Sequence, residues 1–195
     1  TDVWLKFFDE LESLAVRKLV LSGGEVFIRK DLWTLIDALI QRRMRYPILT
    51  NGTLVNERAI DQLQQANRQL RLEGVQVSID GSCAEVHDKS RGVGSFDKAV
   101  NAVRLLKSAN IPVQVRVTLN RYNVDDIDNI ADFLFEKLGL SVFGTNDAIP
   151  LGAGCSNRAG ITLLPEQRLI AMRKLVLLSR KYPGRISANA GALAE

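Results

Sequence analysis

The sequence is poor in cysteine and histidine. Its 195 residues include one histidine and two cysteines, Cys83 and Cys155, which lie far apart. Neither cysteine has a second one at the spacing of a pair of metal ligands. The sequence therefore predicts no disulfide framework and no zinc or iron–sulfur site built from this chain alone. We expect both cysteines to be free thiols.

Long hydrophobic runs are also absent. The longest apolar stretches, such as Leu175–Leu178, are far too short to cross a bilayer. No basic-then-apolar leader opens the chain, so nothing indicates secretion and the expected location is cytoplasmic. With 46% hydrophobic and 25% charged residues, the composition is that of a globular domain. The length suits a single domain with one core over residues 1–195.

The charge balance gives no strong indication of a nucleic-acid partner. The formal net charge is +4, and Arg42, Arg43 and Arg45 form a local basic cluster. Such a cluster is compatible with nucleic-acid binding. It also follows a helix-like segment, and cations are favoured at a helix C-terminus. No aromatic stacking platform accompanies it, so we expect a solvated helix end.

Strand-like and helix-like segments alternate along the chain. The β-rich runs are Leu19–Leu21, Pro47–Leu49, Val75–Ile79, Val113–Leu119, Ser141–Phe143 and Arg185–Ala188. The segments of helical period are Val3–Leu14, Leu32–Arg43, Glu57–Ala66, Phe96–Ala109, Asp125–Lys137 and Glu166–Lys181. This alternation predicts right-handed crossovers and a parallel sheet of about six strands. Periodicity alone does not separate an open doubly wound sheet from part of a barrel.

Polar or glycine clusters follow the expected strands. Because ligands of parallel β/α folds meet the carboxyl ends of the strands, these clusters predict a site for a polar ligand. In chain order they are Ser22-Gly23-Gly24-Glu25, Thr50-Asn51-Gly52, Ser78-Ile79-Asp80-Gly81, Thr118-Leu119-Asn120 and Thr145-Asn146-Asp147.

The first cluster suits an ammonium group. Gly23 and Gly24 let the backbone approach a ligand without obstruction, and Glu25 adds a carboxylate. The alternative is a tight strand-to-helix turn with a solvated glutamate. The spacing is not that of a phosphate-binding loop or a dinucleotide fingerprint.

The later clusters leave similar alternatives open. Asn51-Gly52 suits a simple turn as well as a site. Ser78 and Asp80 lie two residues apart and point to one side of a strand, unless Asp80 only begins a turn. His87 stands in a loop-like stretch, and we interpret it as a structural hydrogen-bonding group rather than a catalyst.

Taken together, these segments resemble the radical S-adenosylmethionine (radical SAM) superfamily, especially the branch with a C-terminal SPASM or twitch extension. The resemblance runs in order from about Trp4 to about Gln167. No single motif is specific, but the ordered set is. The matching stretches are Leu19–Glu25, Arg29–Leu32, Leu49–Val55, Val77–Gly81, His87-Asp88, Arg91-Gly92, Gly94–Phe96, Val115–Asn120, Pro150–Gly152 and Leu164–Glu166.

The resemblance implies an α/β fold, a partial TIM-type (β/α)6 barrel with parallel strands. It implies a 4Fe–4S cluster whose open iron is chelated by the methionine amino and carboxylate groups of S-adenosylmethionine. Reductive cleavage then gives a 5′-deoxyadenosyl radical that abstracts hydrogen from a substrate. The branch includes enzymes of peptide or protein maturation and of tetrapyrrole or cofactor biosynthesis. The implied partners are such a substrate and an electron donor such as flavodoxin or ferredoxin, with no nucleic acid and no membrane.

The resemblance also assigns residues to S-adenosylmethionine by position. An acid suits the ammonium and an arginine suits the carboxylate. The implied assignments are Gly23, Gly24 and Glu25 for the amino group, Ser78 and Arg91 for the carboxylate with Arg116 as a second candidate, Asp80 and Asn51 for the ribose side, and Asn146–Ile149 for backbone contacts to adenine.

Two departures from the family pattern matter. Val26-Phe27 follows Gly-Gly-Glu where the family often has proline, and the three-cysteine motif is absent. We expect a core fragment truncated at its N-terminal end, whose cluster-binding segment and C-terminal extension belong to a full-length parent. The fragment itself is then inert, with no catalytic residue and no metal ligand.

Two other classes stay open. One is a non-catalytic barrel module that binds an amino acid or nucleoside. The other is an unrelated barrel enzyme such as an aldolase, which needs a lysine or acid pair at strand ends, and no expected strand ends in lysine.

Overall fold

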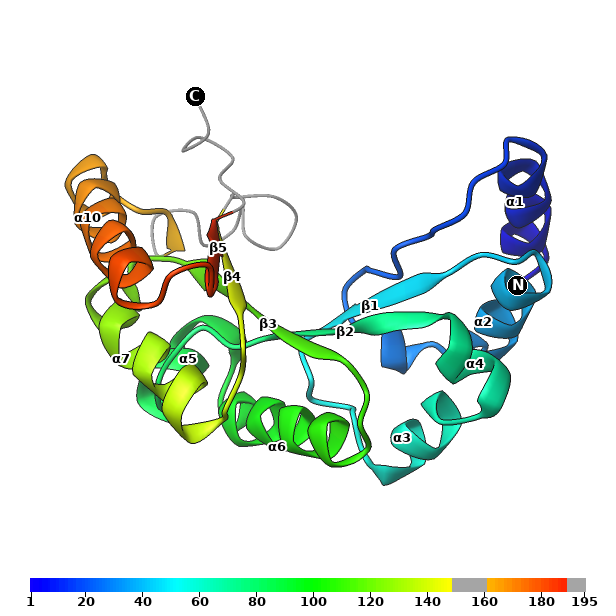
Figure 1. Ribbon diagram of the computed structural model, residues 1–195, viewed down its shortest axis with the longest axis horizontal. Coiled ribbons are helices and arrows are strands. Elements are labelled where there is room, and N and C mark those ends of the chain that lie inside the picture. The colour runs from blue at the N-terminus through cyan, green and yellow to red at the C-terminus, as the bar shows by residue number, and fades with distance from the viewer. Residues whose placement is uncertain (149–160, 189–195) are drawn as a thin grey trace. The chain divides into compact units, whose positions relative to one another are not determined.

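The computed structural model describes residues 1–148 and 161–188 (Figure 1). These residues form two compact units, and each is described by itself. The first unit consists of Thr1–Val77 and Asn101–Val113, and the second of Ser78–Val100 and Gln114–Glu195. The expected residues Ile149, Pro150–Gly152 and Cys155 lie outside the described ranges.

The expected parallel α/β architecture is confirmed. The strands follow one another in chain order across a five-stranded sheet, and the pairs β1–β2, β3–β4 and β4–β5 are parallel. Their bounds are β1 Tyr46–Thr50, β2 Leu72–Ser78, β3 Val113–Leu119, β4 Phe143–Asp147 and β5 Ile186–Ala188.

Helices connect these strands, as expected for parallel pairing. The α-helices are α1 Asp2–Ser13, α2 Leu32–Gln41, α3 Glu57–Leu63, α4 Ala66–Arg71, α5 Ala84–Arg91, α6 Ser95–Ser108, α7 Ile127–Asp132 and α10 Pro165–Lys181. Shorter elements are the 3₁₀ turns η1 Val26–Ile28 and η2 Val124–Asp126 and the π-helical turn η3 Phe133–Lys137. None of the helices in the described ranges has the length and apolar character needed to span a bilayer.

In the first unit, α2 buries one apolar face. Leu35, Ile36 and Leu39 recur at helical spacing and are buried, as is Ile48 of β1. A buried arginine links α4 to α2, because Arg68 of α4 donates two hydrogen bonds of 2.7 Å to the carboxylate of Asp37 in α2. Pairing of this kind is what permits burial of the guanidinium.

In the second unit, β3 separates an apolar face from a polar one. Val115, Val117 and Leu119 are buried, whereas Arg116 and Thr118 alternate with them and are half-buried. Helices α7 and α10 pack against each other, as Figure 1 shows. The alternation leaves the polar face of β3 available to the functional site.

The first expected strand is only partly formed. Residues Leu19–Leu21 run parallel to β1 through two isolated bridges, and the amides of Leu19 and Leu21 donate to the carbonyls of Arg45 and Pro47 at 3.0 Å. The strand expected at Ser141–Phe143 begins later, since β4 spans Phe143–Asp147.

The helix expectations need three corrections. The prediction that His87 lies in a loop-like stretch is wrong, because it lies in α5. The segment expected as one helix over Asp125–Lys137 is divided into η2, α7 and η3. The expected helix Glu57–Ala66 ends at Leu63, and a separate α4 follows it.

Gly81 sets the approach of α5 to the end of β2. A Cβ at this position would lie 2.5 Å from the backbone nitrogen of His87. We expect Gly81→Ala to lower the free energy of unfolding by about 1–3 kcal/mol, because backbone must shift to relieve the overlap. Chemical denaturation measures this loss. Gly24→Ala is the matched control, since a Cβ there meets nothing within 4 Å. Equal losses in the two variants would contradict the steric argument.

Candidate functional site

The carboxylate of Glu25 is held by the end of β1. Its oxygens accept hydrogen bonds from the Thr50 hydroxyl at 2.8 and 2.9 Å and from the Asn51 amide at 2.8 Å. The amide of Phe27 donates to Oε1 at 3.1 Å, so Glu25 also caps η1. No cation among the described residues pairs with this half-buried carboxylate. Glu25 is therefore oriented by uncharged donors and has no cationic partner among the described residues.

Open space adjoins the glycines that precede Glu25. A Cβ added at Gly23 or Gly24 would meet no other atom within 4 Å. Both residues are exposed. The protein itself does not crowd these positions, so a ligand has access to their backbone groups.

In the second unit, Asp80 is almost fully buried and its hydrogen bonds come from three elements. Oδ2 accepts from Arg91 Nε of α5 at 2.5 Å, and Oδ1 accepts from the amide of Thr118 in β3 at 2.7 Å. The amide of Asp80 donates to Nδ1 of His87 at 2.9 Å, and its carbonyl accepts from Asn123 at 2.9 Å. These contacts satisfy the buried charge and fix the end of β2.

Arg91 completes this connection between α5 and β3. Besides the bond to Asp80, its Nη2 donates to the hydroxyl of Thr118 at 3.2 Å. Its side chain is 28% exposed, whereas that of Asp80 is 2% exposed. Arg91 therefore keeps part of its surface accessible to a ligand.

A polar hollow of about 360 Å³ lies beside this network. It is formed by Asp80, Ser90, Arg91, Thr118, Asn120, Asn146, Asp147, Ala148 and Ile161. Asn146 lies opposite Thr118 in the register of β3 and β4. The strand ends of this unit thus meet at one site, as expected.

Two acceptors near the hollow lack a donor. Oδ1 of Asn146 and Oδ2 of Asp147 are buried and accept no hydrogen bond from the described residues. Nε of Arg168 lies 3.6 Å from Asp147 Oδ2, which is an ion-pair distance rather than a hydrogen bond. A ligand that donates N–H or O–H groups would compensate these atoms.

Arg116 lies across the neighbouring strand. A Cβ on Gly144 of β4 would come within 3.0 Å of the guanidinium carbon of Arg116. Gly144 therefore makes room for this guanidinium on the polar face of the sheet.

The expected site residues fall into two groups. Glu25 and Asn51 contact each other in the first unit, next to Gly23 and Gly24. In the second unit Asp80 contacts Arg91. Ser78 ends β2, and Arg116 precedes Thr118 by two residues on β3.

Sequence reasoning assigned no individual role to three residues that organise these groups. Thr50 orients Glu25, Thr118 joins Asp80 to Arg91, and Asn123 donates to the carbonyl groups of both Asp80 and Thr118. Thr50 and Thr118 each stand at a strand end, which is the signal that placed them in the expected polar clusters. Asn123 follows in a turn and carries no comparable signal.

The described residues offer no metal centre. No group of three or more histidine, cysteine, aspartate or glutamate side chains among them is arranged to hold a metal ion. Cys83 is a free thiol, as expected.

These features define a parallel β/α protein with polar side chains and a hollow at the carboxyl ends of its strands. The model of the radical SAM superfamily matches residues 1–134, and the chain belongs to this superfamily. The chain is 31% identical over 155 residues to an AdoMet-dependent heme synthase of Methanosarcina barkeri, a match that covers 79% of this chain and 43% of the relative. It is 30% identical over 172 residues to a PqqA peptide cyclase of Granulibacter bethesdensis, with 88% and 45% covered.

A solved structure agrees with the expected partial barrel. The structure of native anSMEcpe with bound AdoMet matches with a TM-score of 0.78 and 17% identity, covering 96% of this chain and 54% of that one. At this identity the likeness concerns the fold. The chain spans less than half the length of the two curated relatives named above.

The single histidine provides a test of the Asp80 network. Burial lowers the pKa of His87 from its ordinary value of 6.5, because the charged imidazole loses its hydration. The unfolded chain therefore binds the proton first as the pH falls, so the stability from neutral His87 is complete above about pH 6.5 and is lost below it. We expect the melting temperature to fall as the pH is lowered from 7 to about 5, and to fall less in His87→Asn.

His87→Asn suits this test because its amide oxygen takes the position of Nδ1 and can still accept from the Asp80 amide. Thermal unfolding followed by circular dichroism gives both pH profiles. No other histidine titrates in this window, since the chain contains one. Parallel profiles for the two proteins would refute the assignment.

Proposed function

We propose that this chain is the S-adenosylmethionine-binding core domain, residues 1–195, of a radical SAM enzyme that acts in peptide or protein maturation or in tetrapyrrole or cofactor biosynthesis. The observation that carries the proposal is the carboxylate of Glu25. Three N–H and O–H donors orient it, no described cation neutralises it, and it adjoins two uncrowded glycines. That combination favours an ammonium ligand.

The residues of the first unit fit the amino group of S-adenosylmethionine. Glu25 accepts hydrogen bonds from the ammonium, and the backbone carbonyls around Gly23 and Gly24 supply further acceptors. Asn51 holds Glu25 through its amide, and its side-chain oxygen accepts from Thr53. We therefore assign its proposed contact with the ribose side to the NH2 group of its side chain.

The residues of the second unit fit the rest of the ligand. Most of the residues that line the hollow are polar, and Asn146 and Asp147 present buried acceptors that receive no hydrogen bond from the described residues, which suits a nucleoside with hydroxyl and amino groups. Asp80 and Arg91 border it. We assign Asp80 to the ribose side, and Ser78 and Arg91 to the carboxylate, with Arg116 as the second carboxylate candidate.

The described residues do not fit an iron–sulfur cluster, because Cys83 is a single thiol and no metal-ligating group is present among them. We therefore assign the cluster ligands to the full-length parent and no catalytic residue to this chain. When bound at such a cluster, S-adenosylmethionine supplies a 5′-deoxyadenosyl radical for hydrogen abstraction. The part of this chain is to bind and orient the cofactor.

The names of two relatives support the proposed substrate class. One named relative acts on a peptide and another is a heme synthase. We propose a peptide, protein or tetrapyrrole-type substrate and an electron donor such as flavodoxin or ferredoxin, in the cytoplasm.

Glu25→Gln tests the proposal through binding. The amide keeps the shape of the side chain but loses the charge that attracts the ammonium. We expect the Kd for S-adenosylmethionine to rise about 10- to 100-fold, as expected for loss of a charge-assisted hydrogen bond. Isothermal titration calorimetry of the reconstituted full-length protein measures the Kd, and release of 5′-deoxyadenosine under reduction reports cleavage.

Glu12→Gln is the matched control, because Glu12 is an exposed carboxylate of α1 in the same unit. We expect it to leave the Kd unchanged. If the wild-type protein binds S-adenosylmethionine but takes up no iron and releases no 5′-deoxyadenosine, the non-catalytic binding module replaces the enzyme. Equal affinity in wild type and Glu25→Gln would remove the central assignment.

A further inference from the structure

A row of cations lies at the opposite, amino-terminal edge of the first unit's strands. We define the cationic edge as Arg17, Lys18, Arg43, Arg45 and Arg71. Lys18 immediately precedes the paired stretch Leu19–Leu21, Arg45 precedes β1, and Arg71 precedes β2. Because parallel strands begin at the same edge of a sheet, these three residues are brought together there.

The strand register aligns them. Lys18 and Arg45 form an isolated parallel β-bridge. Tyr46 lies opposite Leu72 in the register of β1 and β2, so the preceding residues, Arg45 and Arg71, are neighbours across the two strands. The amide of Arg45 donates to the carbonyl of Arg17 at 2.8 Å, and Arg71 donates to the carbonyl of Arg43 at 3.4 Å. Backbone pairing of Lys18 and Arg17 with Arg45, and the hydrogen bond from the guanidinium of Arg71 to the carbonyl of Arg43, thus hold these residues in one neighbourhood. Neighbouring strands lie about 4.8 Å apart, which sets the spacing of the row.

Carboxylates neutralise little of this charge. Lys18 pairs with Glu73, but no carboxylate of the described residues forms an ion pair with Arg17, Arg43, Arg45 or Arg71. Three of these four arginines are exposed, and Arg71 is partly exposed. By contrast, the adjacent Arg42 pairs with Asp9.

Arg43 occupies a backbone position that glycine prefers. Its φ is +60°, and its amide and that of Met44 donate to the carbonyls of Ile40 and Leu39, which closes α2. This left-handed C-terminal position is usually glycine, because a side chain there is sterically disfavoured. The strained arginine indicates that its side chain serves a purpose that glycine could not serve.

We propose that the cationic edge is a docking surface for an acidic polypeptide segment. Guanidinium groups bind carboxylates through two parallel hydrogen bonds, which favours arginine at such a surface. Carboxylates spaced at i and i+4 on a helix are about 5–6 Å apart and match the spacing of the row.

Nucleic acid is the less favoured partner. The cation–π pairs of the first unit use Arg29 and Arg68, and none involves the cationic edge in the described part of the chain. A surface without an aromatic partner lacks the stacking platform that single-stranded nucleic acids use. The proposal concerns the edge remote from the cofactor and is independent of the proposed function.

Reversing the charge of two arginines of the cationic edge in the full-length protein tests whether this edge binds an acidic peptide. The probe is a synthetic peptide whose glutamates recur every four residues, labelled for fluorescence anisotropy at about 0.15 M salt, where long-range screening is strong. We expect the double variant Arg43→Glu/Arg45→Glu to weaken binding at least about tenfold. Binding of S-adenosylmethionine should be unchanged, which separates this result from the proposed function.

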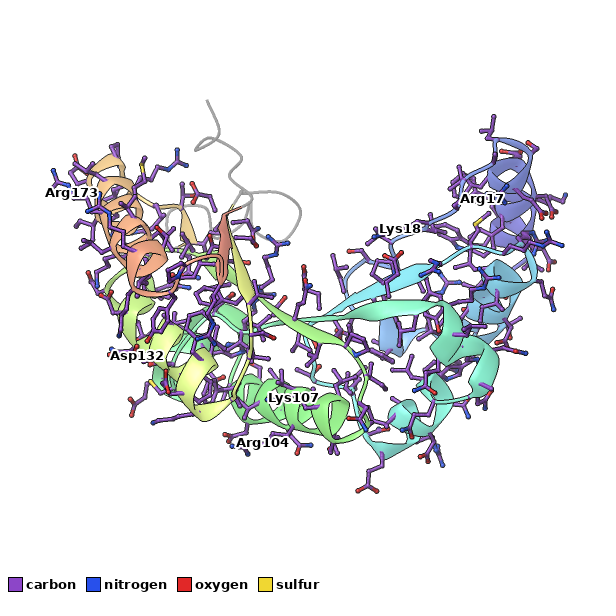
Figure 2. All side chains as sticks on the ribbon, in the orientation of Figure 1. Arg17, Lys18, Arg104, Lys107, Asp132 and Arg173 are labelled. Atoms are coloured by element: carbon purple, nitrogen blue, oxygen red, sulfur yellow. The ribbon has the colours of Figure 1, made fainter. Side chains whose placement is uncertain are left out.

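The matched control reverses an equal charge elsewhere in the unit. Figure 2 shows Arg104 and Lys107 on α6, whereas Arg17 and Lys18 lie on the segment that leads to Leu19. Arg104→Glu/Lys107→Glu should leave peptide affinity within about twofold. The proposal is overturned if both double variants lose affinity equally or if wild type does not bind the peptide. Tighter binding of single-stranded RNA or of phosphatidylserine vesicles than of the peptide would also overturn it.

Arg43→Gly separates the docking role from a structural one. Glycine relieves the left-handed strain, so we expect the melting temperature to rise by about 2–4 °C. Peptide affinity should fall about threefold because one cation is lost. If affinity is unchanged, or if the melting temperature falls, Arg43 is retained for the fold and the proposal fails.

Discussion

The ion pair between Asp80 and Arg91 is the constraint on which the carboxyl edge of the second unit depends. A buried carboxylate is costly unless its oxygens are paired and hydrogen-bonded. Asp80 meets this requirement through α5 and β3 at once. Because these groups come from different elements, satisfying one charge also fixes the end of β2, the C-terminal turn of α5 and the carboxyl end of β3. Asp80, Arg91 and Thr118 also line the hollow, so their contacts help to set its shape.

Glu25 illustrates the opposite use of a carboxylate. It is half-buried and receives donors from Thr50, Asn51 and Phe27, but none of these carries a charge. The carboxylate of Asp80 forms an ion pair with Arg91. The carboxylate of Glu25 is oriented by hydrogen bonds, but no cation among the described residues pairs with it. Two acids at strand ends therefore differ in chemical role. The difference lies in their partners, and the sequence around each acid does not reveal it.

Sequence periodicity predicted the longer elements that bury only one face. The alternation in Val113–Leu119 and the helical spacing in Phe96–Ala109 correspond to β3 and α6. Helix α5 was missed because its residues are mostly polar, and its buried residue, His87, is held by a hydrogen bond rather than by an apolar stripe. The polar strand ends were predicted as a site from their position alone. Which side chains would contact one another was not predictable, because Arg91 reaches Asp80 across eleven residues and Thr118 reaches it across thirty-eight.

The two edges of the first unit carry opposite charges, and their separation allows each to serve a different partner. Glu25 is anchored at the carboxyl end of β1, and the cationic edge lies at its amino end. A strand of five residues spans about 16 Å, whereas charges are screened over about 8 Å at physiological salt. The field of the arginines at Glu25 is therefore weak, and they do not compete with an ammonium ligand for its charge. The length of the strands thus keeps the charges at the two edges of this unit electrostatically separate.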